Sequence, residues 1–151
     1  MQVFNTCYWW NASTDYLEIE NITASQKDYN NRPSNAIDGK EDTFWSGNKK
    51  GSWIQADLGR TKLIHNLEIL WHNGGQKLVH FEVSFSKDGI KFEDPIRFVS
   101  TGTTPEEIFS VDEPNPQHGR YLRLIFDHNT RDNYFSIVSL KVIGRNTKKE
   151  I

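Results

Sequence analysis

The sequence predicts an all-β fold, an antiparallel sandwich or barrel, and two observations support this. The first is alternation: in HFEVSFS the apolar residues Phe81, Val83 and Phe85 are separated by polar ones. A period of two places successive side chains on opposite faces of a strand. The second is that no window of eleven or more residues carries a sustained helical stripe. Short strands separated by closely spaced turns are typical of sandwiches and barrels.

Other segments fit the same class. LIHNLEILW places Leu67, Ile69 and Trp71 on one face, and RYLRLIF, WIQADLG and FSIVSLKVIG are also short apolar-rich runs. Asp88-Gly89 predicts a tight hairpin turn, after which Ile90 and Phe92 continue as the next strand.

Length and composition predict one globular domain. The chain has 151 residues, 36% of them hydrophobic, enough for one core. Its formal net charge of −2 provides no basic excess, so nucleic acid is not expected as a partner. A single cysteine excludes an internal disulfide. The start of the chain is not a signal peptide and no apolar run is long enough to span a membrane, so a secreted form would come from a longer chain.

No motif of a known enzyme class is present, neither G-x-S-x-G nor H-E-x-x-H, a P-loop or a dinucleotide-binding glycine pattern. A zinc site built from His65, His72 and His80 is conceivable, but isolated surface histidines are the commoner explanation. We therefore expect a protein that is not an enzyme.

The segment NAIDGKEDTFW, residues 35–45, is rich in oxygen donors. It either forms a solvated polar turn closed by a buried Trp45 or wraps around a cation. The EF-hand pattern does not fit, because Gly39 directly follows Asp38. Calcium accepts backbone carbonyls among its six to eight oxygens, so a cation remains possible. Spacing alone favours the solvated turn.

This segment resembles the A-I-D-G-x-x-x-T-x-W element of discoidin domains, also called coagulation factor V/VIII type C domains. ITAS, GSWIQADLG, FEVSFSKDGIKF, GRYLRLIF and YFSIVSLKVIG follow in family order. The resemblance is closest to family 32 carbohydrate-binding modules. It implies an eight-stranded antiparallel jelly-roll β-sandwich over residues 16–145, with residues 1–15 as an N-terminal extension of unclear role and residues 146–151 as a C-terminal tail.

The resemblance also implies a structural calcium ion. Its ligands would come from the loop and the start of the last strand: the carbonyls of Asn35, Lys40 and Val138, the carboxylate of Asp38, and both oxygens of Thr43. The family usually places a glutamate after the last of these carbonyls, and here the position is Ser139. A hydroxyl or a water could fill the place of the lost carboxylate, or a monovalent ion could occupy the site in place of calcium.

Family modules bind sugars on loops at one end of the sandwich, which implies three segments here. WSGNKKGS offers Ser46, where many galactose binders have histidine, and Lys49. WHNGGQKLVHF offers His72, with Lys77 at the family's arginine position. The third segment, DHNTRDNYFSI, offers Asn129, Arg131, Asn133 and Tyr134. Trp45, Trp53 and Trp71 are expected to be structural.

Together these features predict a non-catalytic carbohydrate-binding module. The lysines and Arg131 of the loops favour an anionic, uronate-type polysaccharide. The alternative is a protein-interaction or cell-surface adhesion domain. Polar loops make membrane lipid an unlikely partner, and the expected location is extracellular or at the cell surface.

Overall fold

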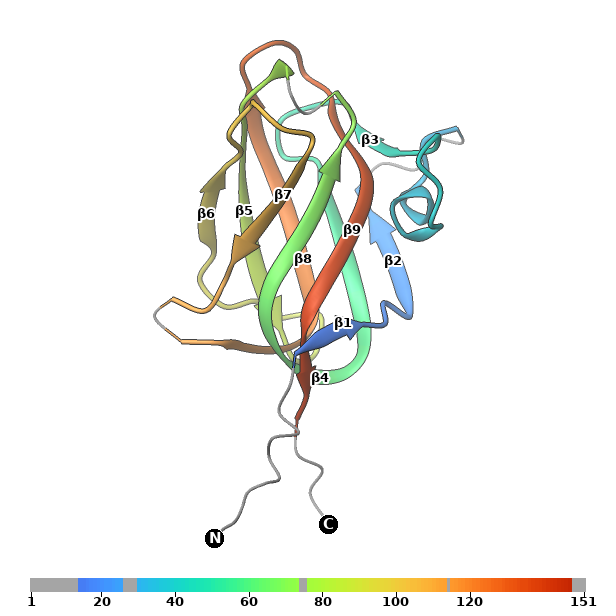
Figure 1. The fold of residues 1–151 in the computed structure, drawn as a ribbon. Helices are drawn as coiled ribbons and strands as arrows, with labels where there is room; N and C mark the ends of the chain where they lie inside the picture. The colour runs from blue at the N-terminus through green and yellow to red at the C-terminus, as the bar shows by residue number, and fades with distance from the viewer. Residues whose placement is uncertain (1–13, 26–29, 74–75, 114, 148–151) are drawn as a thin grey trace, which may run out of the picture.

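The computed structural model describes residues 14–25, 30–73, 76–113 and 115–147. The described residues form nine strands and one short 3-10 helix (Figure 1). In chain order they are β1 (Asp15–Leu17), β2 (Asn21–Ala24), η3 (Pro33–Ile37), β3 (Trp45–Gly47), β4 (Trp53–Trp71), β5 (Val79–Ser86), β6 (Ile96–Val99), β7 (Glu106–Ser110), β8 (Gln117–Asn129) and β9 (Phe135–Asn146).

Strand β4 passes through both layers of the fold. Its first part pairs with β2 and with β8. Strand β8 also pairs with β5, and β5 pairs with β6. Its second part pairs with β7 and β9, and β1 and β3 line the far edge of β9. Between the two parts Gly59 has a positive φ of 85° and the register with β8 shifts. This bend lies at the bottom of Figure 1 and turns one strand into a member of two sheets.

The alternation read from the sequence is confirmed. Phe81, Val83 and Phe85 are at most 2% exposed and face Leu67, Ile69 and Trp71 of the second part of β4 within one core cluster. The ring of Trp71 meets Phe81 edge-on at 5.6 Å between centroids. All pairings are antiparallel, as expected for this class of sandwich. The structure has one strand more than predicted, because β1 and β3 are short edge pieces of three residues each.

The predicted hairpin turn at Asp88-Gly89 is wrong. After Ser86 the next strand begins only at Ile96, and Ile90 is 86% exposed. The carboxylate of Asp88 accepts hydrogen bonds from the amides of Ile90 and Lys91 at 2.8 and 3.0 Å. These local side-chain hydrogen bonds hold the chain in an open loop. A tight turn would instead have started the next strand directly after Gly89.

Gly144 of β9 provides a test of the packing between strands. A Cβ placed there would collide with the carbonyl oxygen of Leu63 in β4. Because a backbone atom cannot swing away, we expect Gly144→Ala to lower the free energy of unfolding by about 1 to 3 kcal/mol in urea titrations. Lys141→Ala, an exposed position on the same strand, is the control and should stay within about 0.5 kcal/mol of the wild type. Equal stability of the two variants would contradict this account.

Candidate functional site

Three connections meet at the end of the sandwich opposite the bend of β4, at the top of Figure 1. We call this the loop end. The amide of His72, just after β4, donates to the carbonyl of Ser136 in β9 at 3.0 Å. Leu78 and Thr130 exchange two hydrogen bonds, which join the β4–β5 and β8–β9 connections. The amide of Gly51 donates to the carbonyl of Phe126 at 2.8 Å and holds the β3–β4 turn beside β8. The predicted loops are therefore neighbours.

Lys77 is buried at the loop end, with a side chain only 8% exposed. Its ammonium lies 3.0 Å from Asp132 Oδ1 and donates to the carbonyl of Tyr134 at 2.8 Å. An ammonium has three hydrogens, so at most one is left for a ligand. Lys77 therefore acts first as a clamp between two loops. Its predicted contact with a ligand would be limited to that remaining hydrogen.

The side chain of Asn129 is also occupied within its own loop. Its amide nitrogen donates to Asp132 Oδ1 and to the carbonyl of Tyr134, at 3.2 and 2.9 Å. Its amide oxygen accepts from the backbone amides of Arg131 and Asp132, both at 2.8 Å. These four bonds leave the amide few free positions, so Asn129 shapes the loop. Predicting this from the sequence would have required recognising Asp132 as the common partner.

Asp132 is the hub of this loop. Burial acts to raise its pKa, but the amide of Tyr134, the ammonium of Lys77 and the amide of Asn129 together hold the pKa below its usual value. The carboxylate is therefore ionised at neutral pH. It fixes the loop so that Arg131, Asn133 and Tyr134 remain exposed, Tyr134 at 55%.

His72 and Ser46 lie close to this loop. The imidazole of His72 is half-buried and stacks on Phe44, with 3.9 Å between ring centroids. Burial lowers the pKa of His72, and the charge of Lys77 lowers it further. At pH 7 the ring is therefore neutral and can both donate and accept a hydrogen bond. The hydroxyl of Ser46 lies 2.9 Å from that of Ser136. Lys49 is exposed on the adjoining turn.

The loop end thus presents one guanidinium, one amide, one phenol ring and a neutral imidazole on a framework held by hydrogen bonds within and between its loops. Such a set can pair with an anion, hydrogen-bond hydroxyl groups and pack against an apolar ring face. Trp45 and Trp71 are buried in the core, at 0% and 3% exposure, as the sequence predicted.

The NAIDGKEDTFW segment forms a closed loop beginning in η3. Asp38 accepts hydrogen bonds from the hydroxyl of Thr43 at 2.6 Å and the amide of Lys40 at 2.9 Å. Burial acts to raise the pKa of Asp38, but these two bonds lower it overall, so the carboxylate is ionised. The side chain of Asn35 donates to the carbonyls of Asn30 and Phe44 and closes the base of the loop.

A cavity of about 140 Å³ lies between this loop and β9, and Lys40, Val138 and Ser139 line it. Three of the six expected calcium ligands therefore share one space, whereas Asn35, Asp38 and Thr43 belong to the same loop but are not among the residues that line the cavity. Three glutamates that the sequence analysis did not select also line it: Glu41, Glu68 and Glu106. Within the described residues, no three His, Cys, Asp or Glu side chains are grouped as metal ligands, which gives the conceivable zinc site no support.

Comparison with known proteins agrees with the fold. The F5/8 type C domain family matches residues 21–140. The chain belongs to this family. No curated protein matches the sequence.

Three solved structures show what this family member is similar to. The family 32 carbohydrate-binding module of AlyQ, in complex with 4,5-unsaturated mannuronic acid, shares 29% identity and a TM-score of 0.78, with 85% of this chain and 97% of that chain covered. Truncated AlyQ, with its family 32 module and alginate lyase domains, shares 28% identity and a TM-score of 0.81, with 91% of this chain and 35% of that chain covered. A pectin-binding carbohydrate-binding module shares 22% identity and a TM-score of 0.74, with 83% of this chain and 91% of that chain covered. At this identity the match supports the fold alone. The predicted family and fold are confirmed.

None of the helical segments among the described residues has the length and apolarity needed to span a bilayer.

The Lys77 clamp can be tested directly. We expect Lys77→Met to lower the free energy of unfolding by about 1 to 3 kcal/mol, because the buried ammonium that bridges Asp132 and the carbonyl of Tyr134 is lost. Urea titration measures the loss. Lys49→Met removes the same charge from an exposed position nearby and should leave stability nearly unchanged. If both variants were equally stable, the clamp would have no energetic role.

Proposed function

We propose that this F5/8 type C domain is a non-catalytic carbohydrate-binding module whose loop end binds an acidic, uronate-type poly- or oligosaccharide. The observation that carries the proposal is the loop end itself, where hydrogen bonds from Lys77 and Asn129 hold the loop while Arg131, Asn133 and Tyr134 stay exposed together. The AlyQ module in complex with 4,5-unsaturated mannuronic acid supports the ligand class.

The residues divide the recognition between them. Arg131 pairs with the carboxylate of a uronate, since a guanidinium matches a carboxylate through two parallel hydrogen bonds. Asn133 and the neutral His72 hydrogen-bond hydroxyl groups. The ring of Tyr134 packs against the C–H face of the sugar. Ser46 of β3 and Lys49 of the adjoining turn extend the site, and Lys77 has one ammonium hydrogen left for a ligand.

A second function, protein interaction or cell-surface adhesion, would use the same exposed loops with a peptide carboxylate in place of the sugar. The polar loops make a lipid surface an unlikely target, because insertion needs exposed apolar side chains. An extracellular or cell-surface location fits a module that meets polysaccharide.

The ligand class is tested by calorimetry with purified oligomannuronates and with neutral galactosides. We expect binding of the uronates only, weakened by added salt because the Arg131 pair is screened. Arg131→Gln should weaken binding roughly tenfold or more, because a charge-assisted hydrogen bond contributes about 1.5 kcal/mol or more.

Lys91→Gln is the matched control, because it removes an exposed charge from the β5–β6 connection at the other end of the sandwich. It should bind like the wild type. Salt-independent binding of neutral galactosides, or binding of a protein partner with no affinity for any glycan, would contradict the proposal.

We also propose that calcium stabilises the loop of residues 35–43 against β9. Asp38, Thr43, Asn35 and Lys40 would hold the ion from the loop, and Val138 from the strand. Ser139 lacks the carboxylate usual in the family, and the glutamates lining the same cavity supply negative charge near the ion. The ion would tie loop to strand and take no part in chemistry.

Thermal unfolding with calcium and with chelator tests this proposal. A cation that binds only the folded state raises stability, by about 2.7 kcal/mol at a concentration near 100 times its Kd. We expect calcium to raise the melting temperature of the wild type and of Asp42→Asn, an exposed neighbouring carboxylate, but not that of Asp38→Asn. An identical melting temperature of the wild type with calcium and with chelator would refute a calcium site.

A further inference from the structure

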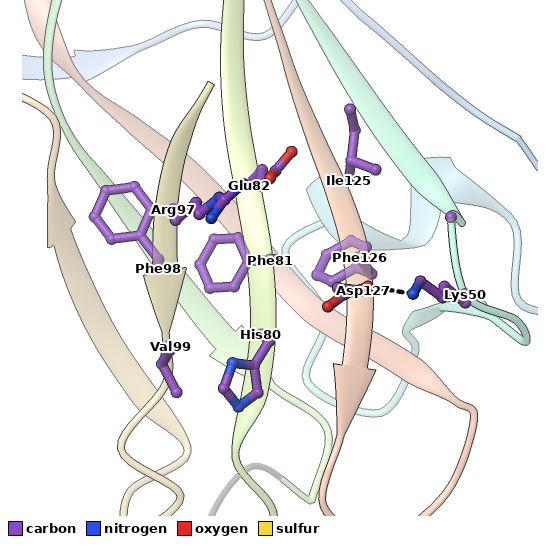
Figure 2. A pocket seen from close by; sticks show the side chains of 11 residues that line it. Lys50, His80, Phe81, Glu82, Arg97, Phe98, Val99, Ile125, Phe126 and Asp127 are labelled. Atoms are coloured by element: carbon purple, nitrogen blue, oxygen red, sulfur yellow. Dashed lines mark hydrogen bonds and ion pairs between the residues drawn. The ribbon is translucent and has the colours of Figure 1, made fainter. Parts of the chain in front are cut away.

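A groove of about 530 Å³ lies on the sheet formed by β8, β5 and β6, beside the loop end rather than on it (Figure 2). Phe81 and Phe126 form its floor from the core side and are at most 2% exposed. Val99 and Ile125 above them are apolar, but most side chains above them are polar or charged, and these come from all three strands and from the β3–β4 turn. They include Lys50, His80, Glu82, Arg97 and Asp127.

The groove adjoins the loop end. In the pairing of β5 with β8, Val79 lies opposite Asn129 and His80 lies opposite His128. Asn129 belongs to the loop proposed to bind sugar, so the groove begins one residue away from that loop. It then continues along the strands from His80 to Glu82, about 7 Å at roughly 3.3 Å per residue.

A β-bulge shapes the near end of the groove. The register steps from His80 opposite His128 to Phe81 opposite Phe126, which leaves Asp127 as an extra residue of β8. Bulges re-aim side chains at the edges of binding sites. Here Asp127 pairs with Lys50 of the turn at 3.1 Å, drawn as a dashed line in Figure 2, and with His128 at 2.8 Å.

The groove carries cations that can change partners. The side chains of Lys50 and Arg97 are 80% and 86% exposed, and each is paired with a carboxylate, Asp127 or Glu82. Exposed ion pairs of this kind are weak, so a carboxylate from a ligand can compete with the protein's own. His80 and His128 stack with 4.0 Å between centroids and bring further hydrogen-bonding edges to the wall.

The aromatic residues of the groove do not provide a platform for a neutral sugar. Phe81 and Phe126 are buried, and Phe98 packs against the core. A neutral glycan that depends on stacking against an exposed ring therefore finds no such surface on this floor. The two exposed cations of the walls, Lys50 and Arg97, can instead pair with the carboxylates of an acidic chain in exchange for Asp127 and Glu82.

We propose that this groove is a second subsite, which takes the continuation of an acidic polysaccharide whose first residues are held at the loop end. The inference rests on the function proposed above and adds the direction in which the chain runs. Arg97 pairs with a uronate carboxylate in exchange for Glu82, and His80 hydrogen-bonds the intervening hydroxyl groups. The module accordingly binds several consecutive residues of a polysaccharide and not its end alone.

The test compares oligomannuronates of increasing length, from dimer to hexamer, by calorimetry. For the wild type we expect affinity to rise several-fold with length. Arg97→Gln should flatten this rise, and Arg97→Glu should remove it, while the affinity for the dimer stays that of the wild type. Arg97 is exposed on an edge strand, so circular dichroism should show both variants folded.

Lys91→Glu, a charge reversal outside the groove, is the matched control and should keep the full rise. A wild type with no gain from length would overturn the subsite. So would an Arg97→Glu variant with an unchanged gain, or one that loses dimer and hexamer affinity equally. In each of these cases, a wild type that still binds the dimer would continue to support the function proposed for the loop end. A wild type that binds no uronate of any length would instead overturn the loop-end function, and the groove with it.

Discussion

The bend of β4 is the constraint on which the rest of the molecule depends. One strand of nineteen residues enters the first sheet at Trp53 and leaves the second at Trp71, so both layers share a continuous backbone. Gly59 permits this with a positive φ that few other residues tolerate without strain. Because β4 turns back at one end, its second part ends at the other, and the chain leaves it at His72 beside the β8–β9 connection.

At that end a buried lysine and two more exposed polar side chains order the loops before any ligand arrives. Lys77, Asn129 and Asp132 form one network that joins two connections. A loop ordered in advance loses less conformational entropy on binding than a free one. The same network reduces the number of groups that remain free, so the residues available to a ligand are those that the network leaves outside, such as Arg131 and Asn133.

Electrostatics in this protein is local rather than global. The net charge of −2 predicts no strong attraction for a polyanion. The structure gathers charge in two places: the groove of β5, β6 and β8 holds Lys50 and Arg97 beside Asp127 and Glu82, and the cavity beside the loop of residues 35–43 holds three glutamates beside two lysines. Local ion pairing in this way matters more than the net charge.

The sequence by itself determined the long strands β4, β5, β8 and β9, core residues such as Phe81 and Trp71, and the family, because alternation and short motifs depend on neighbours in the chain. It also indicated which three segments carry polar groups. It could not assign Lys77 and Asn129 their roles as loop-forming residues, since Lys77 meets a partner 55 positions away. Nor could it show the open loop after Ser86, which replaced the expected hairpin, or the groove beside the loop end. Only the tertiary structure decided these features. The pairing of strands that are distant in the chain decides which polar groups become buried and which residues they contact.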